Sequence, residues 1–345
     1  MKFNKKDLLA SYEKVKVAIQ KTSVIPIFST VRFIANSGKY TLVGSNSMYQ
    51  LTSVGECDGD DYFDLCFPAD KLGVMLSSSK DEIEITGYDG KASSKSGKSK
   101  FNFSTYRGDD YPIISNNDGI VCDGLNIREI VGNVYSCSAR NNVMVVLNGV
   151  CISSDGETIK ASATDGHILA SLKTDLKSNE FSIIIPYEVA LILASRDSKS
   201  ISINKNKSVQ VLFKDGSSLI SKVLDGQYPS WETLVNYDSP MHFNVDKDEF
   251  LECIKTASRV SQDGVVKLRA DNNKMIIVAS SYDGNYETEI DCDGDDLDVT
   301  FKTSLLISAI DVVDTDNFSL KFNNKMNKFK YDDCGVTVVI MPMRA

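Results

Sequence analysis

Apolar residues recur along the chain at two different spacings, one typical of helices and one typical of strands. In the run from 7 to 20 they fall three or four residues apart, as on the buried face of an amphipathic helix: Leu8, Leu9, Tyr12, Val15 and Ile19. The next three runs are rich in alternating or β-branched residues, at 24–35, 39–43 and 49–54. The pattern therefore predicts a helix followed by strands.

The same alternation continues to the end of the chain. A strand at 62–67 leads into a helix at Ala69–Ser78, and strands are expected around 82–86, 91–96 and 100–105. Further helices are predicted at Ile127–Ser138, Tyr187–Ser195, Lys247–Arg259 and Ser304–Val313, which makes six short helices among many strands. Asp-Gly pairs at 155, 215 and 283 are hairpin signals. The expected class is α+β, with antiparallel sheets covered on one side by paired helices.

The chain also repeats itself. Tyr111-Pro112, Tyr228-Pro229 and Met341-Pro342 are separated by 117 and 113 residues, and Pro68 and Pro186 each stand where a strand hands over to a helix. The run 1–4 is echoed at 241–244, and 57–61 is echoed at 292–296. Such a long period indicates tandem domains. We predict three, at 1–117, 118–240 and 241–345, with linkers near 115–119 and 235–240.

Composition limits the possible functions. The formal net charge is −9, which argues against wholesale electrostatic capture of nucleic acid. Charge is uneven, however, since residues 1–30 carry six lysines against Asp7 and Glu13, and a second basic stretch holds Lys91, Lys95, Lys98 and Lys100. No run of about 18 apolar residues is present and no signal-peptide core follows the N-terminus, so a cytoplasmic protein without a membrane partner is expected.

Cysteine and histidine usage bears on metal chemistry. Eight cysteines are scattered without a Cys-x-x-Cys pair, and the chain has two histidines. That spacing does not favour zinc, and we expect no metal and no cofactor. The cysteines are interpreted as small buried residues in a reducing compartment, in preference to disulfides.

Two motifs resemble ligand loops but lack required residues. Gly97-Lys98-Ser99 looks like the end of a phosphate loop, although Ala92 stands where the first glycine belongs. Asp291, Asp293 and Asp295 look like the start of a calcium loop, although Asp296 and Lys302 replace its glycine and its bidentate glutamate. Neither is expected to bind its ligand.

Three segments give the chain a family resemblance. They are Leu147-Asn148-Gly149, the run Ala163-Thr164-Asp165-Gly166-His167-Ile168-Leu169-Ala170, and the terminal Val338-Val339-Ile340-Met341-Pro342-Met343-Arg344. Together they resemble the bacterial β sliding clamp of DNA polymerase III. The runs 96–105 and 225–229 resemble the same family at matching places, so the similarity spans essentially the whole chain.

This resemblance implies a non-catalytic function. Two three-domain chains would pair head to tail into a closed ring around duplex DNA, with helices lining the hole. The ring would tether the replicative polymerase as a processivity factor, because a tethered enzyme works at high effective concentration. The expected partners are duplex DNA without sequence preference, the polymerase, the clamp loader and a second copy of the chain.

The resemblance also implies site residues. Candidate DNA-facing residues lie on or beside the helices: Lys5, Lys6, Lys14, Lys16, Lys21, Lys71, Arg128, Arg140, Arg196, Lys255 and Lys302. Partner peptides would dock in an apolar pocket with one wall made by Thr164, Gly166, His167, Ile168 and Leu169, and the other by Val339, Met341, Pro342, Met343 and Arg344. Methionines suit a surface that accepts varied peptides. At the seam of the ring, Phe101 of one chain would meet Arg259 and Val260 of the other.

The chain departs from the family at four places, and these put the usual partner peptide in doubt. Ile168 stands where many relatives have Arg, Asn236 where a proline is usual, Met144 where a basic residue is common and Ala345 where Leu often ends the chain.

Two other functions stay open at this point. One is a repeat-built α+β adaptor that never encircles DNA, which would bind linear and circular duplex alike. The other is a hydrolase that uses Asp165 and His167, although no nucleophile motif accompanies them.

Overall fold

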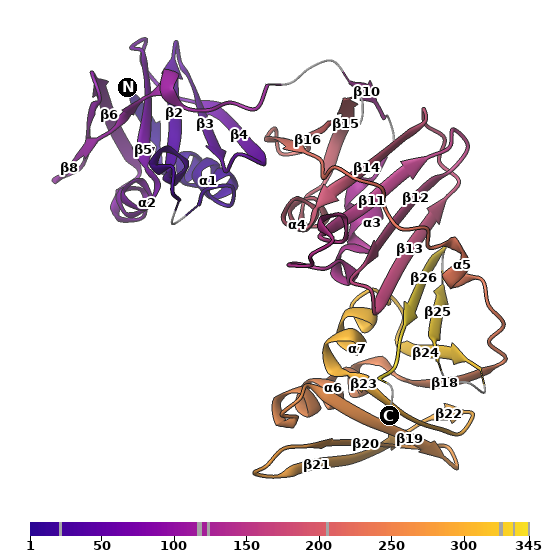
Figure 1. Ribbon diagram of the computed structural model, residues 1–345. Helices are drawn as coiled ribbons and strands as arrows, with labels where there is room; N and C mark the ends of the chain where they lie inside the picture. The colour runs from indigo at the N-terminus through magenta and orange to yellow at the C-terminus, as the bar shows by residue number, and fades with distance from the viewer. Residues whose placement is uncertain are drawn as a thin grey trace. The chain divides into compact units, whose positions relative to one another are not determined.

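Figure 1 shows the computed structural model of the chain. It describes residues 1–20, 23–115, 119–122, 125–204, 207–323, 327–333 and 335–343. The chain forms two compact units, one made of residues 1–125 with 197–223 and the other of residues 126–196 with 224–345. The three domain boundaries expected from the repeat remain a prediction, because the two compact units do not divide the chain at these positions.

The first unit holds two helices and two antiparallel sheets. Its helices are α1 (Lys5–Lys16) and α2 (Ala69–Ser78). The smaller sheet has the order β1 (Lys2–Asn4), β6 (Glu82–Tyr88), β7 (Lys91–Ser96), β8 (Ser99–Ser104). The larger sheet has the order β10 (Ile120–Val121), β15 (Ser198–Asn204), β16 (Ser208–Phe213), β17 (Ser218–Lys222), β4 (Tyr49–Glu56), β3 (Lys39–Ser45), β2 (Thr30–Asn36), β5 (Phe63–Pro68), β9 (Tyr106–Arg107).

The second unit is built in the same way. Its helices are α3 (Ile127–Gly132), α4 (Tyr187–Ser195), α5 (Glu232–Val235), α6 (Lys247–Val260) and α7 (Thr303–Ile310). The larger sheet has the order β14 (Phe181–Pro186), β11 (Gly149–Ser154), β12 (Ile159–Thr164), β13 (Ile168–Thr174), β26 (Val336–Ile340), β25 (Phe329–Asp333), β24 (Asn317–Phe322), β18 (Met241–Asp246), β22 (Asp293–Gly294). The smaller sheet has the order β21 (Asn285–Asp291), β20 (Lys274–Ser280), β19 (Val265–Asp271), β23 (Leu297–Lys302).

One strand arrangement occurs three times along the chain. In each copy a three-stranded meander (β2-β3-β4, β11-β12-β13 and β19-β20-β21) is flanked by the strand that precedes the second helix (β5, β14 and β23). A second meander closes each copy, ending in β8, β17 and β26. The last strand of the second copy pairs with β4, and that of the third copy pairs with β13. This leaves β8 and β21 as outer strands of the two four-stranded sheets.

All six predicted helices are present, although their ends shift. The first begins at Lys5, because the Asn4 side chain accepts hydrogen bonds from the backbone N–H of Lys6 at 2.9 Å and of Asp7 at 3.3 Å. The helix expected over 127–138 ends at Gly132 and continues only as a 3₁₀ turn, η3 (Tyr135–Cys137). Glycine is a poor helix former, which accounts for the early end.

Two sequence expectations were wrong. The strand expected to start at Val24 starts at Thr30, because Pro26 opens a 3₁₀ turn, η1 (Pro26–Ser29). Met341-Pro342 is not the counterpart of the other two proline pairs. It follows β26 directly, whereas Tyr111-Pro112 and Tyr228-Pro229 lie several residues beyond β8 and β17.

The motifs that resemble ligand loops are structural turns. Gly97 and Lys98 form the tight hairpin between β7 and β8, with Gly97 at φ +58°. Asp293 and Gly294 form the short strand β22 beside β18, and a Cβ at Gly294 would lie 2.2 Å from the carbonyl oxygen of His242. The described cysteines form no disulfide with one another. Cys66, Cys122, Cys137, Cys151 and Cys292 are buried as expected, whereas Cys57 and Cys253 are only half-buried. Cys334 lies outside the described residues.

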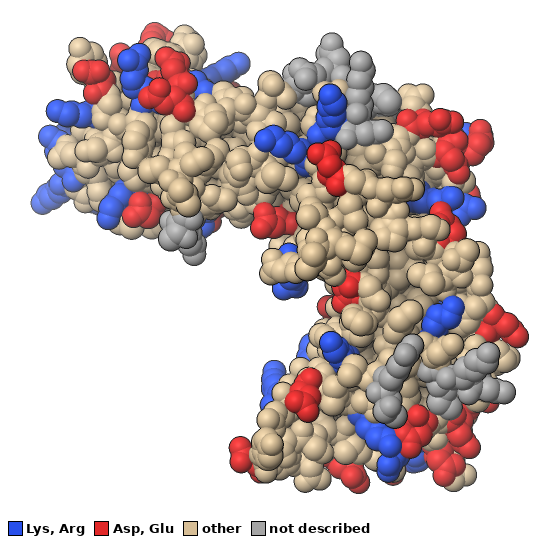
Figure 2. Space-filling model, viewed as in Figure 1, with Lys and Arg blue, Asp and Glu red and all other residues tan. Residues whose placement is uncertain are grey.

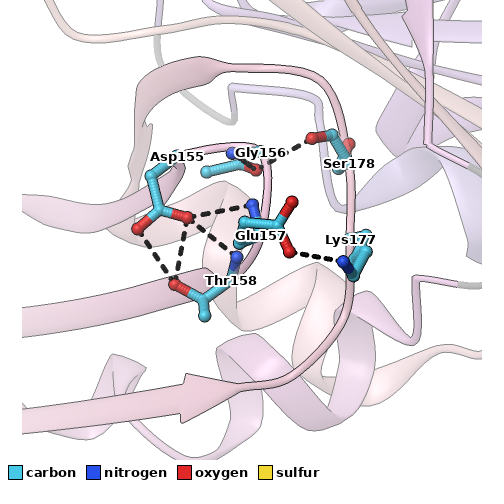
Figure 3. Close-up of polar contacts among 7 residues, drawn as sticks. Asp155, Gly156, Glu157, Thr158, Lys177 and Ser178 are labelled. Atoms are coloured by element: carbon cyan, nitrogen blue, oxygen red, sulfur yellow. Dashed lines mark hydrogen bonds and ion pairs between the residues drawn. The ribbon is translucent and has the colours of Figure 1, made fainter.

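The Asp-Gly hairpin between β11 and β12 is stabilised by hydrogen bonds to the Asp155 side chain (Figure 3). Asp155 Oδ1 accepts hydrogen bonds from the backbone N–H of Glu157 at 3.1 Å and of Thr158 at 2.8 Å. These bonds hold the pKa of Asp155 below its ordinary value of 3.8. Lys177, on the segment between β13 and β14, pairs with Glu157 of this turn.

We expect Asp155→Asn to lower the free energy of unfolding at neutral pH and to leave it unchanged in acid. The folded-state pKa of Asp155 is depressed, so its carboxylate stabilises the fold above the unfolded-state pKa. This contribution is lost as the pH falls through the folded-state pKa. Urea unfolding from about pH 7 down to about pH 3 would measure the difference between variant and parent. A difference that does not shrink as the pH falls would contradict the assignment.

Candidate functional site

The expected docking surface centres on the turn between β12 and β13. Asp165 Oδ1 accepts hydrogen bonds from the backbone N–H of His167 at 2.7 Å and of Ile168 at 2.9 Å. Thr164 Oγ1 donates to the Ile168 carbonyl at 2.6 Å, and Gly166 adopts φ +97°, which favours glycine. Asp165 is therefore a turn-forming carboxylate. The described residues place no nucleophile against it, so nothing in this geometry favours the hydrolase hypothesis.

The structure brings the two expected walls together within the second unit. Strands β13 and β26 pair antiparallel, with Ile168 opposite Ile340 and Leu169 opposite Val339. The backbone N–H of Met341 donates to the His167 carbonyl at 2.9 Å. Segments far apart in sequence thus lie side by side, as Figure 1 shows for β13 and β26.

The wall residues differ in how much surface they offer. Ile168, Leu169 and Val339 are buried at 3–4% exposure, so they offer little surface to a partner. Met341 and Met343 are 38% and 40% exposed. Gly166 and His167 are exposed, and Thr164 and Pro342 are half-buried. Arg344 lies outside the described residues.

A neighbouring apolar loop was not among the predicted site residues. Val143, Met144 and Val145 are 97%, 54% and 56% exposed. The loop is tied to the turn through Asn142, whose Nδ2 donates to the Asp165 carbonyl at 3.5 Å and whose Oδ1 accepts from the Met144 N–H at 2.9 Å. The run of three apolar residues just before Val146 is the sequence signal that could have found it. Met144 was noted only as a departure from the family.

Beneath the loop lies a small apolar core. Asn148, from the Leu-Asn-Gly motif, accepts from the Asn142 N–H at 2.7 Å and fixes the start of the loop. Val146, Leu147, Cys151, Ile184 and Ala139 pack together, and Tyr228 packs against them. Burial raises the pKa of the Tyr228 phenol, so it stays neutral. The exposed loop therefore stands on a fixed base.

Among the described residues, most of the predicted DNA-facing side chains lie on helices or at their ends, and several are already engaged. Lys14 pairs with Asp215 at 3.0 Å, Lys16 with Glu13 at 2.7 Å, and Lys71 lies 3.8 Å from Asp70. The guanidinium of Arg140 stacks over the Tyr187 ring at 4.9 Å.

The remaining candidates are placed as follows. Lys5 donates to the Ser77 carbonyl at 3.2 Å, whereas Lys6, Arg128, Lys255 and Lys302 have exposed side chains. Arg196 follows α4 and is half-buried, and Lys21 lies outside the described residues.

Charge on the helices is nearly balanced. Helices α1 to α4, α6 and α7 together carry nine Lys or Arg against eight Asp or Glu. Asp311, just beyond α7, has its pKa raised by burial, partly offset by Lys255 and Lys247. In Figure 2 blue and red side chains are mixed over the visible face. Helices with so little net positive charge would attract a polyanion only weakly.

The predicted seam residues occupy two different elements. Phe101 lies on the outer strand β8, half-buried, with its ring stacked on Phe103 at 6.4 Å. Arg259 and Val260 end α6, where Arg259 is exposed and Val260 is half-buried. Phe101 belongs to the first compact unit, whereas Arg259 and Val260 belong to the second.

Comparison with known proteins decides the family. Two adjacent family models, described as the central domain and the C-terminal domain of the DNA polymerase III beta subunit, match residues 123–230 and 234–344. The chain belongs to the DNA polymerase III beta sliding clamp family. Beta sliding clamps from Staphylococcus aureus and Staphylococcus epidermidis are each 26% identical to it, over 95% of this chain and 94% of theirs.

Solved beta clamps share the fold over the whole chain. The beta subunit of Pseudomonas aeruginosa superposes with a TM-score of 0.86 at 20% identity, covering 100% of both chains. The sliding clamp of Bacillus subtilis gives 0.85 at 22% identity, covering 100% of this chain and 98% of the other. The Helicobacter pylori beta clamp, solved bound to a DNA ligase peptide, gives 0.87 at 18% identity, covering 100% of both chains. The described residues include no helix long and apolar enough to cross a membrane.

Proposed function

We propose that this beta clamp works as a homodimeric ring that encircles duplex DNA, tethers the replicative polymerase and docks partner peptides on the surface around Met341 and Met343. It would do so without chemistry of its own, in the cytoplasm with its template. Family membership supports the clamp function. The ring, the docking surface and the DNA contacts are supported by features of this chain.

The observation that carries the ring is the strand order. Within each unit, the last strand of one repeat joins the meander of the repeat before it, as β17 joins β4 and β26 joins β13. The last strand of the first repeat, β8, and the corresponding meander strand of the third, β21, are outer strands. An exposed outer strand is a template for pairing with another chain. Pairing β8 of one protomer with β21 of its partner, twice, would close a head-to-tail ring.

The internal junction also supplies a register for the seam. Val338 of β26 lies opposite Ala170 of β13. Val338 and Phe101 correspond, because each is in the third residue pair counted from the turn of its hairpin, β25-β26 or β7-β8. Ala170 and Tyr286 correspond, because each is in the second pair counted from the turn of β12-β13 or β20-β21. The same register places Lys100 opposite Glu287.

The two outer strands have complementary chemistry. Strand β8 exposes Lys100, next to Lys98 in its turn, whereas β21 exposes Glu287, Glu289 and Asp291 on alternate positions. Lys274 already pairs with Asp291 at 2.6 Å and Glu289 at 3.6 Å. In the described part of the chain, Glu287 has no such ion pair. Opposite charges on facing strands fix register and speed association.

The proposal of a docking surface depends on a group of exposed methionines. Peptides of varied sequence can be accepted by flexible, polarisable side chains such as Met341, Met343 and Met144. Where many relatives have a basic residue or an arginine, this clamp has Met144 and Ile168. We therefore propose that its partner peptides rely on apolar anchors and less on acidic side chains than is usual.

Retention on closed circular DNA is expected to depend little on salt. A ring whose helices are nearly neutral would make few phosphate contacts, and each contact contributes about one unit to the slope of log K against log salt. Between about 50 and 200 mM salt we expect less than a tenfold change in dissociation rate from nicked circles. A filter or gel-filtration assay would measure it, with the same plasmid linearised as control. A steep loss from closed circles would contradict topological retention.

The deciding experiment compares circular and linear DNA. The protein should sediment as a dimer and remain on nicked circles after loading by the clamp loader, and then leave when the circle is cut. Equal binding to circles and short linear duplex would favour the adaptor hypothesis. A strictly monomeric protein at about micromolar concentration would reject the ring.

A further inference from the structure

We propose a second interaction site on the first repeat, a cleft that takes a basic segment of a partner protein through its arginine or lysine side chains. The cleft has a volume of about 460 Å³. Tyr62, Tyr88, Asp89, Arg107 and Asp109 line its mouth. It belongs to the first unit, whereas the docking surface belongs to the second.

Beside the cleft, strands β6 and β7 carry a small cross-strand pair. Gly87 of β6 stands opposite Ala92 of β7. At the corresponding place the second repeat has Ile203 opposite Val209, both buried, and the third has Phe322 stacked on Phe329 at 5.1 Å. The first copy therefore differs from the other two at this position, and its small pair leaves room for Leu65 and Phe63 to pack against Gly87.

Two side chains in the walls of the cleft pack directly against glycines, Leu65 against Gly87 and Asp64 against Gly108. A Cβ at Gly87 would lie 2.6 Å from Leu65 Cδ1, and a Cβ at Gly108 would lie 1.7 Å from Asp64 Oδ1. Asp64 itself is held by Arg32, which donates to it from Nε at 2.9 Å and from Nη2 at 2.5 Å. The floor is therefore fixed, and the charge of Asp64 is already paired.

The rim carries the features that recognise a cation. Tyr88 is 82% exposed and Tyr62 is 65% exposed, so both rings at this cleft are accessible to a partner. The exposed carboxylates of Asp89 and Asp109 line the same cleft and outnumber the one guanidinium, that of Arg107. Aromatic faces and carboxylates together attract guanidinium or ammonium groups. Charge complementarity therefore favours a basic segment and disfavours nucleic acid.

The test uses the full-length protein without DNA, so its outcome is independent of the proposed ring. Fluorescein-labelled hexa-arginine is titrated at about 100 mM salt and followed by anisotropy. We expect Tyr62→Ala/Tyr88→Ala and Asp89→Asn/Asp109→Asn each to weaken binding about fivefold or more. Asp293→Asn/Asp296→Asn removes the same charge from exposed positions on the third repeat and should leave binding unchanged.

Two results would overturn the proposal. Equal weakening by the charge-matched control would mean that the peptide senses only the net charge. Unchanged binding by the tyrosine variant would show that the two rings take no part in recognition. Unaltered thermal melting of each variant, expected because the replaced side chains are exposed, keeps either result interpretable.

Discussion

Lys100→Glu is expected to convert the ring into monomers and to abolish retention on circular DNA. In the proposed register Lys100 faces Glu287 of the partner, so the change places like charges opposite each other at both seams of one ring. Like-charge juxtaposition at an interface costs several kcal/mol, and two seams double the effect. We expect the dimer dissociation constant to rise by about two orders of magnitude or more. Sedimentation over a concentration series would measure it.

The reverse change on the other strand tests the register itself. Glu287→Lys alone should weaken the dimer as Lys100→Glu does, and the two changes in one chain should restore much of the loss, because each seam then regains an opposite pair. Lys91→Glu is the matched control, since Lys91 is an exposed lysine on the inner strand β7. Failure of the double variant to recover, with both single variants impaired, would reject this register while leaving other seams possible.

Met341→Ala with Met343→Ala is expected to abolish productive contact with the polymerase and the clamp loader while the dimer remains intact. Each side chain is about two-fifths exposed, and its burial under a peptide would contribute on the order of 1–2 kcal/mol. We expect peptide affinity to fall about a hundredfold and clamp-dependent primer extension to stop.

A methionine in the first repeat provides the control for this change. Met48 is 36% exposed, and its carbonyl accepts the Lys222 N–H at 2.9 Å, as the His167 carbonyl accepts the Met341 N–H. It occupies the equivalent turn but lies outside the proposed docking surface. Met48→Ala should leave primer extension unchanged. Equal losses in both variants would indicate a general effect of exposed methionines and not a docking site.

Some features of the site followed from sequence because they depend on short-range chemistry. The helices were recognisable from the spacing of apolar residues, and the Asp-Gly turns from the conformations that these residues favour. The strand expected from Val24 failed, because Pro26 favours a 3₁₀ turn over an extended start.

Other features could not follow from sequence because they depend on distant residues. The exposed loop at Met144 is brought to the Asp165 turn by Asn142 and Asn148, and no spacing rule joins these positions. Likewise, the ion pair of Lys14 with Asp215 of a distant hairpin, at 3.0 Å, could not be read from the sequence, and a DNA-facing role for Lys14 stays a prediction. Whether a lysine meets solvent or a carboxylate is decided by the fold.

The sequence by itself determined that this chain is a threefold-repeated α+β protein, because the hydrophobic period and the turn residues act over a few neighbours and recur at each copy. Its motifs also indicated the clamp family. Only the tertiary structure decided which strands find partners inside the chain and which remain at an edge. Strand pairing joins residues more than a hundred positions apart, as it does for β13 and β26, so the outer strands β8 and β21 are visible only in the folded chain.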